Sequence, residues 1–282
     1  MKVGYLGPEG TFSEEAGKVY AKKLEGKMEM IPYSTLHDIL YAADKGEINE
    51  AVVPIENSID GTIGTVTDML VKEVDLKICQ EIILPVFHYL LAKRSVKINE
   101  ISDVISNPPP LEQCKDFLRT KMPKAKLHLA YSTSDAARQV AQSPAPFFAA
   151  IGTLSAARLY GLSIVAKKIN AKDNETRFVV LSKKDHKRTG DDKTSIVFSI
   201  AKDKPGGLHD ILSEFAERDI NLTKIESRPG KRLLGDYYFF ADMQGYRDDS
   251  KIKDALSQIK SKAAFFRLLG SYPRFKQKRR HT

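Results

Sequence analysis

The residues best suited to chemistry lie at the start of a strongly β-forming segment. In "AKDNETRFVVLSKKD", residues 171–185, the polar run 174–177 leads directly into an apolar run that is typical of a buried strand. One interpretation is structural: Asp173 and Asn174 form a turn, and Arg177 is solvated at the sheet edge. The other is functional: a hydroxyl donor and a guanidinium begin the strand because they line a site. The rest of the chain must decide between them.

Four further stretches place Ser, Thr or Asn at predicted helix starts: "GPEGTFSEEA" (7–16), "PIENSIDGTIG" (54–64), "SNPPPLEQC" (106–114) and "YSTSDAA" (131–137). Helix N-termini present unpaired N–H groups and partial positive charge, which suit carboxylates. Each such residue taken alone is most simply a helix cap. Several caps that converge on one cleft favour a small dianionic ligand.

The composition limits the classes of protein to consider. With 282 residues, 42% of them hydrophobic, the chain is long enough for more than one domain. The two cysteines, Cys79 and Cys114, form no CxxC pair, and the six histidines show no metal-ligand spacing, so we expect no metal and no disulfide. The sequence has no apolar leader and no apolar run of membrane-spanning length, which predicts a cytoplasmic protein.

The formal charge of +9 does not by itself indicate a nucleic-acid partner. Five of the basic residues lie in the final stretch "RFKQKRRHT", and without them 40 basic face 36 acidic residues. No helix-turn-helix, zinc-finger or RNA-binding aromatic pattern is present, so we interpret the stretch as a solvated tail and predict no nucleic-acid partner. The remaining surplus is compatible with an anionic substrate.

Strand and helix patterns alternate through the first part of the chain, which predicts an α/β fold with a mainly parallel sheet. The apolar segment at 76–92, interrupted by Pro85, suits a crossing between two lobes. After it the alternation restarts, and "LSIVAKKI" and "TRFVVLSKK" are predicted to return to the first lobe. The first lobe is therefore expected at about 1–77 and 163–183, and the second at about 78–162. The cleft between two such lobes is the expected ligand site.

A smaller unit follows a charged linker. Residues 182–193 contain no apolar residue, which predicts a linker. Residues 194–272 then give the order β-α-β-β-α-β of a ferredoxin-like domain, and 273–282 form the basic tail. The first domain is thus expected to span 1–183.

These stretches together resemble a known enzyme family. "GPEGTFSEEA", "VPIENSIDGTIGTVTDML", "SNPPPLEQC", "NETRF", "KPGGLHDIL" and "NLTKIESRP" occur in the order and spacing of monofunctional prephenate dehydratase with a C-terminal ACT domain. The resemblance implies a two-lobed, periplasmic-binding-protein-like catalytic domain. It also implies conversion of prephenate to phenylpyruvate, with loss of carbon dioxide and the ring hydroxyl, in phenylalanine biosynthesis without a cofactor. The chain shows no additional N-terminal helical segment, so we expect no fused chorismate mutase.

The resemblance also implies site residues. Thr176 of the "TRF" motif is the expected catalytic residue, a hydrogen-bond donor to the leaving hydroxyl. The expected substrate-binding residues are Thr11, Asn57, Ser58, Ser106, Gln113, Arg177 and Phe178. In a regular strand Thr176 and Phe178 share one face and Arg177 the other, so Arg177 either reaches a carboxylate or anchors the loop. Relatives usually read close to "SHPQALxQC", and Asn107–Pro110 depart from that pattern.

The ACT unit is expected to bind phenylalanine between two copies of the chain, in a homodimer or homotetramer. The resemblance implies Gly206, Gly207, Leu208, Asn221 and Leu222 as the effector site, where glycines allow close backbone approach at a helix N-terminus. His209 replaces a usual apolar residue there.

Two alternatives belong to other classes of protein. A solute-binding protein also uses a two-lobed α/β cleft, but normally has a signal peptide and no regulatory domain. An amino-acid-sensing regulatory protein with an inactive first domain is compatible with the "NPPP" departure. Turnover of prephenate distinguishes the enzyme from both.

Overall fold

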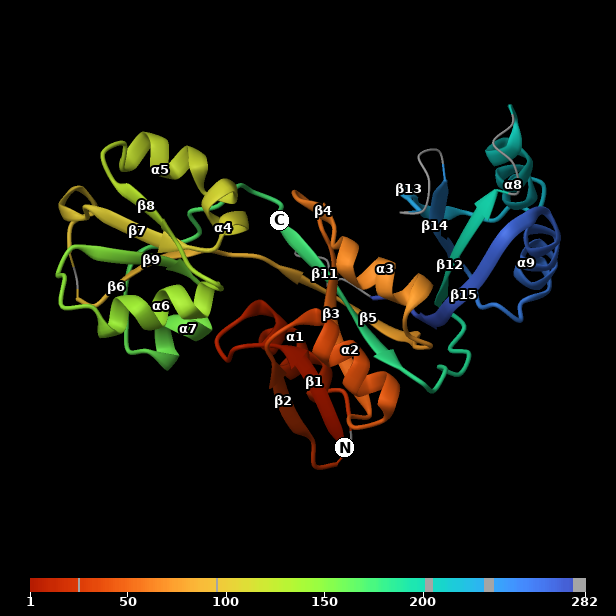
Figure 1. Cartoon of the computed structure of the whole chain (residues 1–282), viewed down its shortest axis with the longest axis horizontal. Coiled ribbons are helices and arrows are strands. Elements are labelled where there is room, and N and C mark those ends of the chain that lie inside the picture. The colour runs from red at the N-terminus through yellow and green to blue at the C-terminus, as the bar shows by residue number, and fades with distance from the viewer. Residues whose placement is uncertain (25, 95, 201–204, 231–235, 276–282) are drawn as a thin grey trace. The chain divides into compact units, whose positions relative to one another are not determined.

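The computed structural model describes residues 1–24, 26–94, 96–200, 205–230 and 236–275 (Figure 1). The chain divides into two compact units. The first consists of Met1–Val66 and Ile82–Phe178, and the second of Thr67–Glu81 and Val179–Thr282. From residue 276 on, the predicted basic tail lies outside the described residues.

The first sheet has the strand order β2-β1-β3-β11-β5, with β4 paired to β3. β1 runs parallel to both β2 and β3, as the β-α alternation predicted. Its strands are β1 (Lys2–Leu6), β2 (Glu29–Tyr33), β3 (Glu50–Asn57), β4 (Gly61–Thr62), β5 (Lys77–Pro85) and β11 (Glu175–Ser182). The helices that follow its strands are α1 (Phe12–Ala21), α2 (Leu36–Lys45) and α3 (Gly64–Lys72).

The second sheet has the order β10-β6-β9-β7-β8. Its strands are β6 (Tyr89–Ala92), β7 (Asp103–Ser106), β8 (Lys126–Leu129), β9 (Phe148–Gly152) and β10 (Ser163–Ala166). The short helices with this sheet are η1 (Ile98–Glu100), α4 (Pro108–Gln113), α5 (Lys115–Lys121), α6 (Thr133–Gln142) and α7 (Leu154–Leu159). Apolar clusters on its two faces, one around Leu90 and one around Leu91, follow from the period of two in β6.

Two predicted lobe assignments are corrected. β10, expected to return to the first lobe, pairs antiparallel with β6 in the second sheet. β5, expected to belong to the second lobe from residue 78, is a strand of the first sheet. Alternation of apolar residues identifies a strand, but the choice of partner strand depends on packing that the local pattern does not contain.

The third sheet has the order β13-β14-β12-β15 and confirms the predicted β-α-β-β-α-β sequence. Its elements are β12 (Asp192–Ile200), α8 (Gly207–Ala216), β13 (Leu222–Pro229), β14 (Tyr237–Gln244), α9 (Ser250–Lys262) and β15 (Ala263–Pro273). The paired strands are antiparallel. An apolar core that includes Phe198, Phe215 and Ile259 joins the two helices to one face of the sheet.

Residues 67–81 pack with the third sheet within the second unit. Arg267 Nη1 donates to the carbonyl oxygens of Leu70 (2.6 Å) and Val74 (2.9 Å), at the end of α3. A Cβ on Gly270 would lie 2.2 Å from the carbonyl oxygen of Ile78, so only glycine fits at this approach of β15 to β5. The buried Glu81 accepts from Lys193 Nζ at 2.9 Å.

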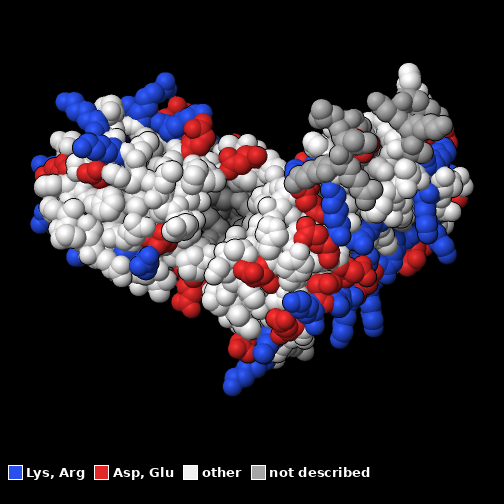
Figure 2. Space-filling view, viewed as in Figure 1, with Lys and Arg blue, Asp and Glu red and all other residues white. Residues whose placement is uncertain are grey.

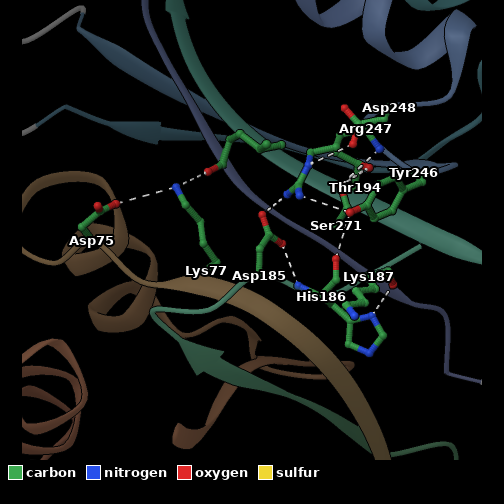
Figure 3. Close-up of polar contacts among 11 residues, drawn as sticks. Asp75, Lys77, Asp185, His186, Lys187, Thr194, Tyr246, Arg247, Asp248 and Ser271 are labelled. Atoms are coloured by element: carbon green, nitrogen blue, oxygen red, sulfur yellow. Dashed lines mark hydrogen bonds and ion pairs between the residues drawn. The ribbon is translucent and has the colours of Figure 1, made fainter. Parts of the chain in front are cut away.

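The predicted linker is anchored at its start. Figure 3 shows Asp185 paired with Arg247, and Tyr246 Oη donating to the His186 carbonyl oxygen at 2.9 Å. The same view shows Lys77 Nζ donating to a main-chain carbonyl of β15, that of Leu268, at 3.0 Å. Residues of the charged linker therefore have defined partners in the second unit.

Candidate active site

A cluster of amides forms where β3 ends and β11 begins, because these two strands are neighbours in the first sheet. Asn57 is the last residue of β3, and its Oδ1 accepts the backbone N–H groups of Ile59 (2.9 Å) and Asp60 (3.0 Å). This is an Asx turn, the local structure that asparagine favours at the end of a strand. It fixes which end of the Asn57 amide faces the loop.

The other end of the Asn57 amide orients Thr176. Asn57 Nδ2 donates to Asn174 Oδ1 at 2.8 Å and to Thr176 Oγ1 at 3.0 Å. The Thr176 hydroxyl oxygen is thus an acceptor, and its own proton has no acceptor among the residues that the structure describes. The side chain is 9% exposed. The arrangement leaves a buried O–H group that can donate to another molecule.

Gln113 is the last residue of α4, one of the helices of the second sheet. It links that sheet to the pair Asn57 and Asn174. Its Nε2 donates to Asp60 Oδ2 at 2.6 Å, and its Oε1 accepts from Asn174 Nδ2 at 2.7 Å. His88 Nε2 lies 2.8 Å from the same Oε1. An ionised carboxylate can only accept hydrogen bonds. The Asp60 carboxylate therefore requires the Nε2 end of the Gln113 amide to face it.

Ser58 fastens the loop after β3 to the start of β11. Its N–H donates to the Glu175 carbonyl oxygen, and its Oγ accepts from the Glu175 N–H, both at 2.9 Å. Its hydroxyl donates to the Asp173 carbonyl oxygen at 3.0 Å. Ser58 therefore holds the two strand ends at the spacing that the Asn57 contacts require.

Four other predicted site residues are engaged elsewhere. Thr11 is the N-cap of α1, and its hydroxyl donates to the carbonyl oxygens of Pro8 and Leu6. Ser106 is fully buried and donates to the Ile151 carbonyl oxygen at 2.8 Å. Phe178 is buried in the core, and Arg177 lies 3.6 Å from Glu56, on the strand face opposite Thr176. The structure brings together Asn57, Ser58, Gln113 and Thr176.

The prediction that the start of α4 binds an anion is wrong. Pro108, Pro109 and Pro110 occupy its first three positions, and proline has no backbone N–H. The first N–H of the helix, that of Leu111, donates to the Asn107 carbonyl oxygen at 3.4 Å. The helix therefore offers no free donors to a carboxylate there.

Burial changes two pKa values near the cluster. It lowers the pKa of His88 to about 4, while the hydrogen bond to Gln113 and the charge of Asp60 act in the opposite direction. His88 is therefore neutral near pH 7. Burial also raises the pKa of the Cys114 thiol to about 12, so this residue is unreactive. Both cysteines are buried, and neither forms a disulfide.

Sequence reasoning missed three residues of the cluster: Asn174, His88 and Asp60. Asn174 lies inside the "NETRF" motif, where the sequence leaves open a turn or the wall of a site. His88 interrupts the apolar run "LPVFHYLLA", and a polar residue at such a position is a signal that could have been used. Asp60 is exposed in a loop, and no local pattern distinguishes it from a solvated aspartate.

The predicted effector residues lie around α8 and β13 of the third sheet. Gly206 is the N-cap of α8 with φ of 84°, a conformation that favours glycine, and Gly207 begins the helix. Leu208 and Leu222 pack against the core of this domain. Asn221 is exposed, and its carbonyl oxygen accepts from the Gln244 N–H at 3.0 Å.

Two basic residues of α5 have acidic partners close in sequence. Figure 2 shows basic and acidic side chains side by side in this region, where Lys115 pairs with Glu112 and Arg119 pairs with Asp116.

Among the described residues, no group of three or more His, Cys, Asp or Glu is placed to hold a metal ion. No helix within the residues that the structure describes is long and apolar enough to cross a membrane.

Comparisons with known proteins agree with the fold and the motifs. Residues 3–186 match the family described as prephenate dehydratase, and residues 194–261 match the ACT domain. The prephenate dehydratase of Methanocaldococcus jannaschii is 37% identical over 276 residues, which are 96% of this chain and 97% of the relative. The bifunctional chorismate mutase/prephenate dehydratase of Aquifex aeolicus is 37% identical over 97% of this chain and 74% of its own length.

A solved structure is similar over almost the whole chain. The structure of prephenate dehydratase from Arthrobacter aurescens in complex with L-Phe has a TM-score of 0.87 and 33% identity, and the match covers 97% of this chain and 90% of that one. The predicted class is confirmed: an α/β enzyme followed by a ferredoxin-like domain. The chain belongs to the prephenate dehydratase family and has an ACT domain near its C-terminal end.

Proposed function

We propose that this chain converts prephenate to phenylpyruvate, carbon dioxide and water. The bond between the ring and its carboxylate breaks, the electron pair moves into the ring, and the bond to the ring hydroxyl breaks in turn. Aromatisation supplies the driving force. The protein must therefore hold two carboxylates and assist the departure of a hydroxyl group, and neither task needs a redox cofactor.

The observation that carries this proposal is the orientation of Thr176. Asn57 donates to its Oγ1 at 3.0 Å, so the hydroxyl proton is available to the leaving oxygen. A neutral threonine is a weak acid, so it acts as a preorganised donor that stabilises the charge developing on that oxygen. The leaving oxygen takes its final proton from the solvent, so each turnover consumes one proton and releases water.

The surrounding amides define the substrate contacts that we propose. Asn57, Ser58 and Gln113 form the wall beside Thr176, with Asn174 within it. Arg177 faces Glu56 instead, so its part is to hold β11 against β3. We retain Thr11, Ser106 and Phe178 only as residues that shape the surroundings, since their polar groups are engaged or their side chains lie in the core.

We further propose regulation by phenylalanine at the ACT domain. A relative in this family was solved in complex with L-Phe. The bend at Gly206 and the exposed Asn221 supply backbone and amide groups suited to an amino acid. We propose a site between two copies of the chain, hence a homodimer or homotetramer, and a cytoplasmic location, which suits cysteines that form no disulfide.

The test is direct turnover. Purified protein is incubated with prephenate, phenylpyruvate is followed over time, and the assay is repeated with phenylalanine and with Thr176→Ala. We expect product with the parent protein and a strongly reduced rate with the variant. Absence of phenylpyruvate with a folded parent protein would rule out the enzyme and favour the amino-acid-sensing alternative.

A further inference from the structure

His88 occupies a fixed position directly before β6. Its backbone N–H donates to Asn170 Oδ1 at 2.8 Å, and its carbonyl oxygen accepts from the Ile169 N–H at 3.0 Å. The ring lies edge-on to Phe12, with 5.5 Å between ring centroids and 75° between ring planes. The side chain is 2% exposed. Backbone and ring contacts together leave the imidazole little freedom to move.

The hydrogen-bond partners determine which ring nitrogen carries the proton. Gln113 directs Nε2 to the Asp60 carboxylate, so its Oε1 faces His88. An oxygen acceptor at 2.8 Å requires a donor, so His88 Nε2 is protonated. His88 Nδ1 is then the unprotonated nitrogen, and it is buried without a hydrogen-bond partner among the described residues.

This orientation is transmitted to Thr176 by the two asparagines. If the Gln113 amide turned over, its Nε2 would meet Asn174 Nδ2, donor against donor. Asn174 cannot turn to compensate, because its Oδ1 accepts from Asn57 Nδ2 at 2.8 Å, and Asn57 is held by two backbone N–H groups. One consistent set of amide orientations therefore connects His88 to the hydroxyl of Thr176.

We propose that His88 is a positioning residue for the reaction proposed above: together with Asp60, its Nε2–H holds the amide of Gln113 in one orientation and, through Asn174 and Asn57, keeps Thr176 oriented as a donor. This inference rests on the proposed function of Thr176. It assigns no direct contact between His88 and the substrate.

The placement of the imidazole supports a role beyond packing. A buried nitrogen without a partner destabilises the fold, and an aliphatic side chain in the same apolar run would avoid that cost. Burial holds the pKa of His88 at about 4, so the ring keeps the neutral form that the hydrogen bond to Gln113 needs. Protonation would add a second N–H at Nδ1, in the place without an acceptor.

The kinetic test compares two substitutions. His88→Leu removes the donor, and we expect kcat for prephenate to fall about tenfold or more, with KM changed by less than about threefold, since orientation of Thr176 matters at the transition state. His88→Gln places an amide N–H where Nε2 lies, and we expect it to restore most of kcat. His128→Leu, at a half-exposed histidine paired with Asp103, is the matched control and should leave both constants unchanged.

A second measurement uses the unmodified protein. The nitrogen chemical shifts of a ¹⁵N-labelled His88 ring should show protonated Nε2 and unprotonated Nδ1, with no titration above about pH 5. A protonated Nδ1, or titration near the ordinary histidine pKa, would overturn the proposal even if His88→Leu fails to fold. Full kcat in a folded His88→Leu variant would overturn it as well. An inactive parent protein would instead defeat the proposed function and, with it, this inference.

Discussion

The hydroxyl of Thr176 is oriented by Asn57 before substrate binds, so its loss should affect chemistry more than binding or folding. We expect Thr176→Ala to lower kcat roughly 100- to 1000-fold, the usual effect of losing a preorganised donor. Thr176→Ser keeps a hydroxyl and should retain much more activity. Thr120→Ala, at an exposed threonine of α5, is the control. Steady-state kinetics and a thermal melt of each variant check this, and a kcat of Thr176→Ala equal to the parent value would remove Thr176 from the mechanism.

The buried His88 should make stability depend on pH. Its folded pKa of about 4 lies below the ordinary value of 6.5, so between these values the unfolded chain binds more protons than the folded chain. Stability is therefore complete above pH 6.5 and falls as pH drops towards 4, by up to about 3 kcal/mol. The pKa of about 4 already includes the effect of the negative charge of Asp60, which favours the protonated ring.

Urea unfolding of the parent protein and of His88→Gln at several pH values between 4 and 7 measures this contribution. The glutamine does not titrate, so the unfolding free energy of the parent protein should fall relative to that of His88→Gln as pH drops from 7 towards 4, while the contributions of other groups cancel. Parallel stability curves for the two proteins would show that His88 keeps an ordinary pKa.

At the scale of elements, Arg177 belongs to the contact between β11 and β3. Its guanidinium lies 3.6 Å from Glu56, and its side chain is 11% exposed. We expect Arg177→Ala to lower the melting temperature by several degrees, because it leaves Glu56 without this partner at a largely buried site, while KM of the surviving enzyme changes little. A carboxylate-binding Arg177 would instead raise KM in both Arg177→Lys and Arg177→Ala, with the melting temperature nearly unchanged.

The sequence predicted most elements correctly because their signals are local. The strand at 175–182 follows from its β-branched and aromatic residues, and the caps of α1 and α6 follow from Thr11 and Ser132. The partner of β10 was wrong, because its pairing with β6 depends on residues about 70 positions earlier in the chain. The donors expected at α4 were wrong because proline removes them, which its residue type alone should have indicated.

The candidate site was predictable only in part. The motifs identified Asn57, Ser58, Gln113 and Thr176, which the fold brings together. His88 and Asp60 join them only through tertiary structure, because each lies far from Gln113 in sequence. The polar His88 within an apolar run indicates an unusual position but not its partner, and Asp60 has no local pattern that points to it. Conversely, Ser106 has a suitable residue type but is buried against Ile151. Residue type shows which groups are capable of chemistry, and three-dimensional contacts show which are available for it.

At the scale of the whole molecule, the site and the proposed effector residues fall in different units. Asn57, Asp60, His88, Gln113 and Thr176 all belong to the first unit, whereas Gly206 and Asn221 belong to the second. The segment 67–81 belongs to the second unit although the chain reaches it directly from the loop that holds Asn57. We expect any influence of the effector on catalysis to pass through the chain connection between α3 and that loop.

This division predicts separate losses on truncation and on substitution in the ACT domain. A chain ending at Lys187 keeps every residue of the amide cluster, so it should still turn over prephenate. It should melt at a lower temperature, because Glu81 loses Lys193 and the end of α3 loses Arg267.

In the full-length protein, phenylalanine should change apparent substrate affinity roughly 5- to 150-fold, the range of a coupling of about 1–3 kcal/mol. Asn221→Ala should abolish that response with basal activity near normal, and the truncated chain should not respond at all. Inhibition of the truncated chain at the same phenylalanine concentration as the parent would place the effector site outside the ACT domain, because no residue of that domain would remain to bind it.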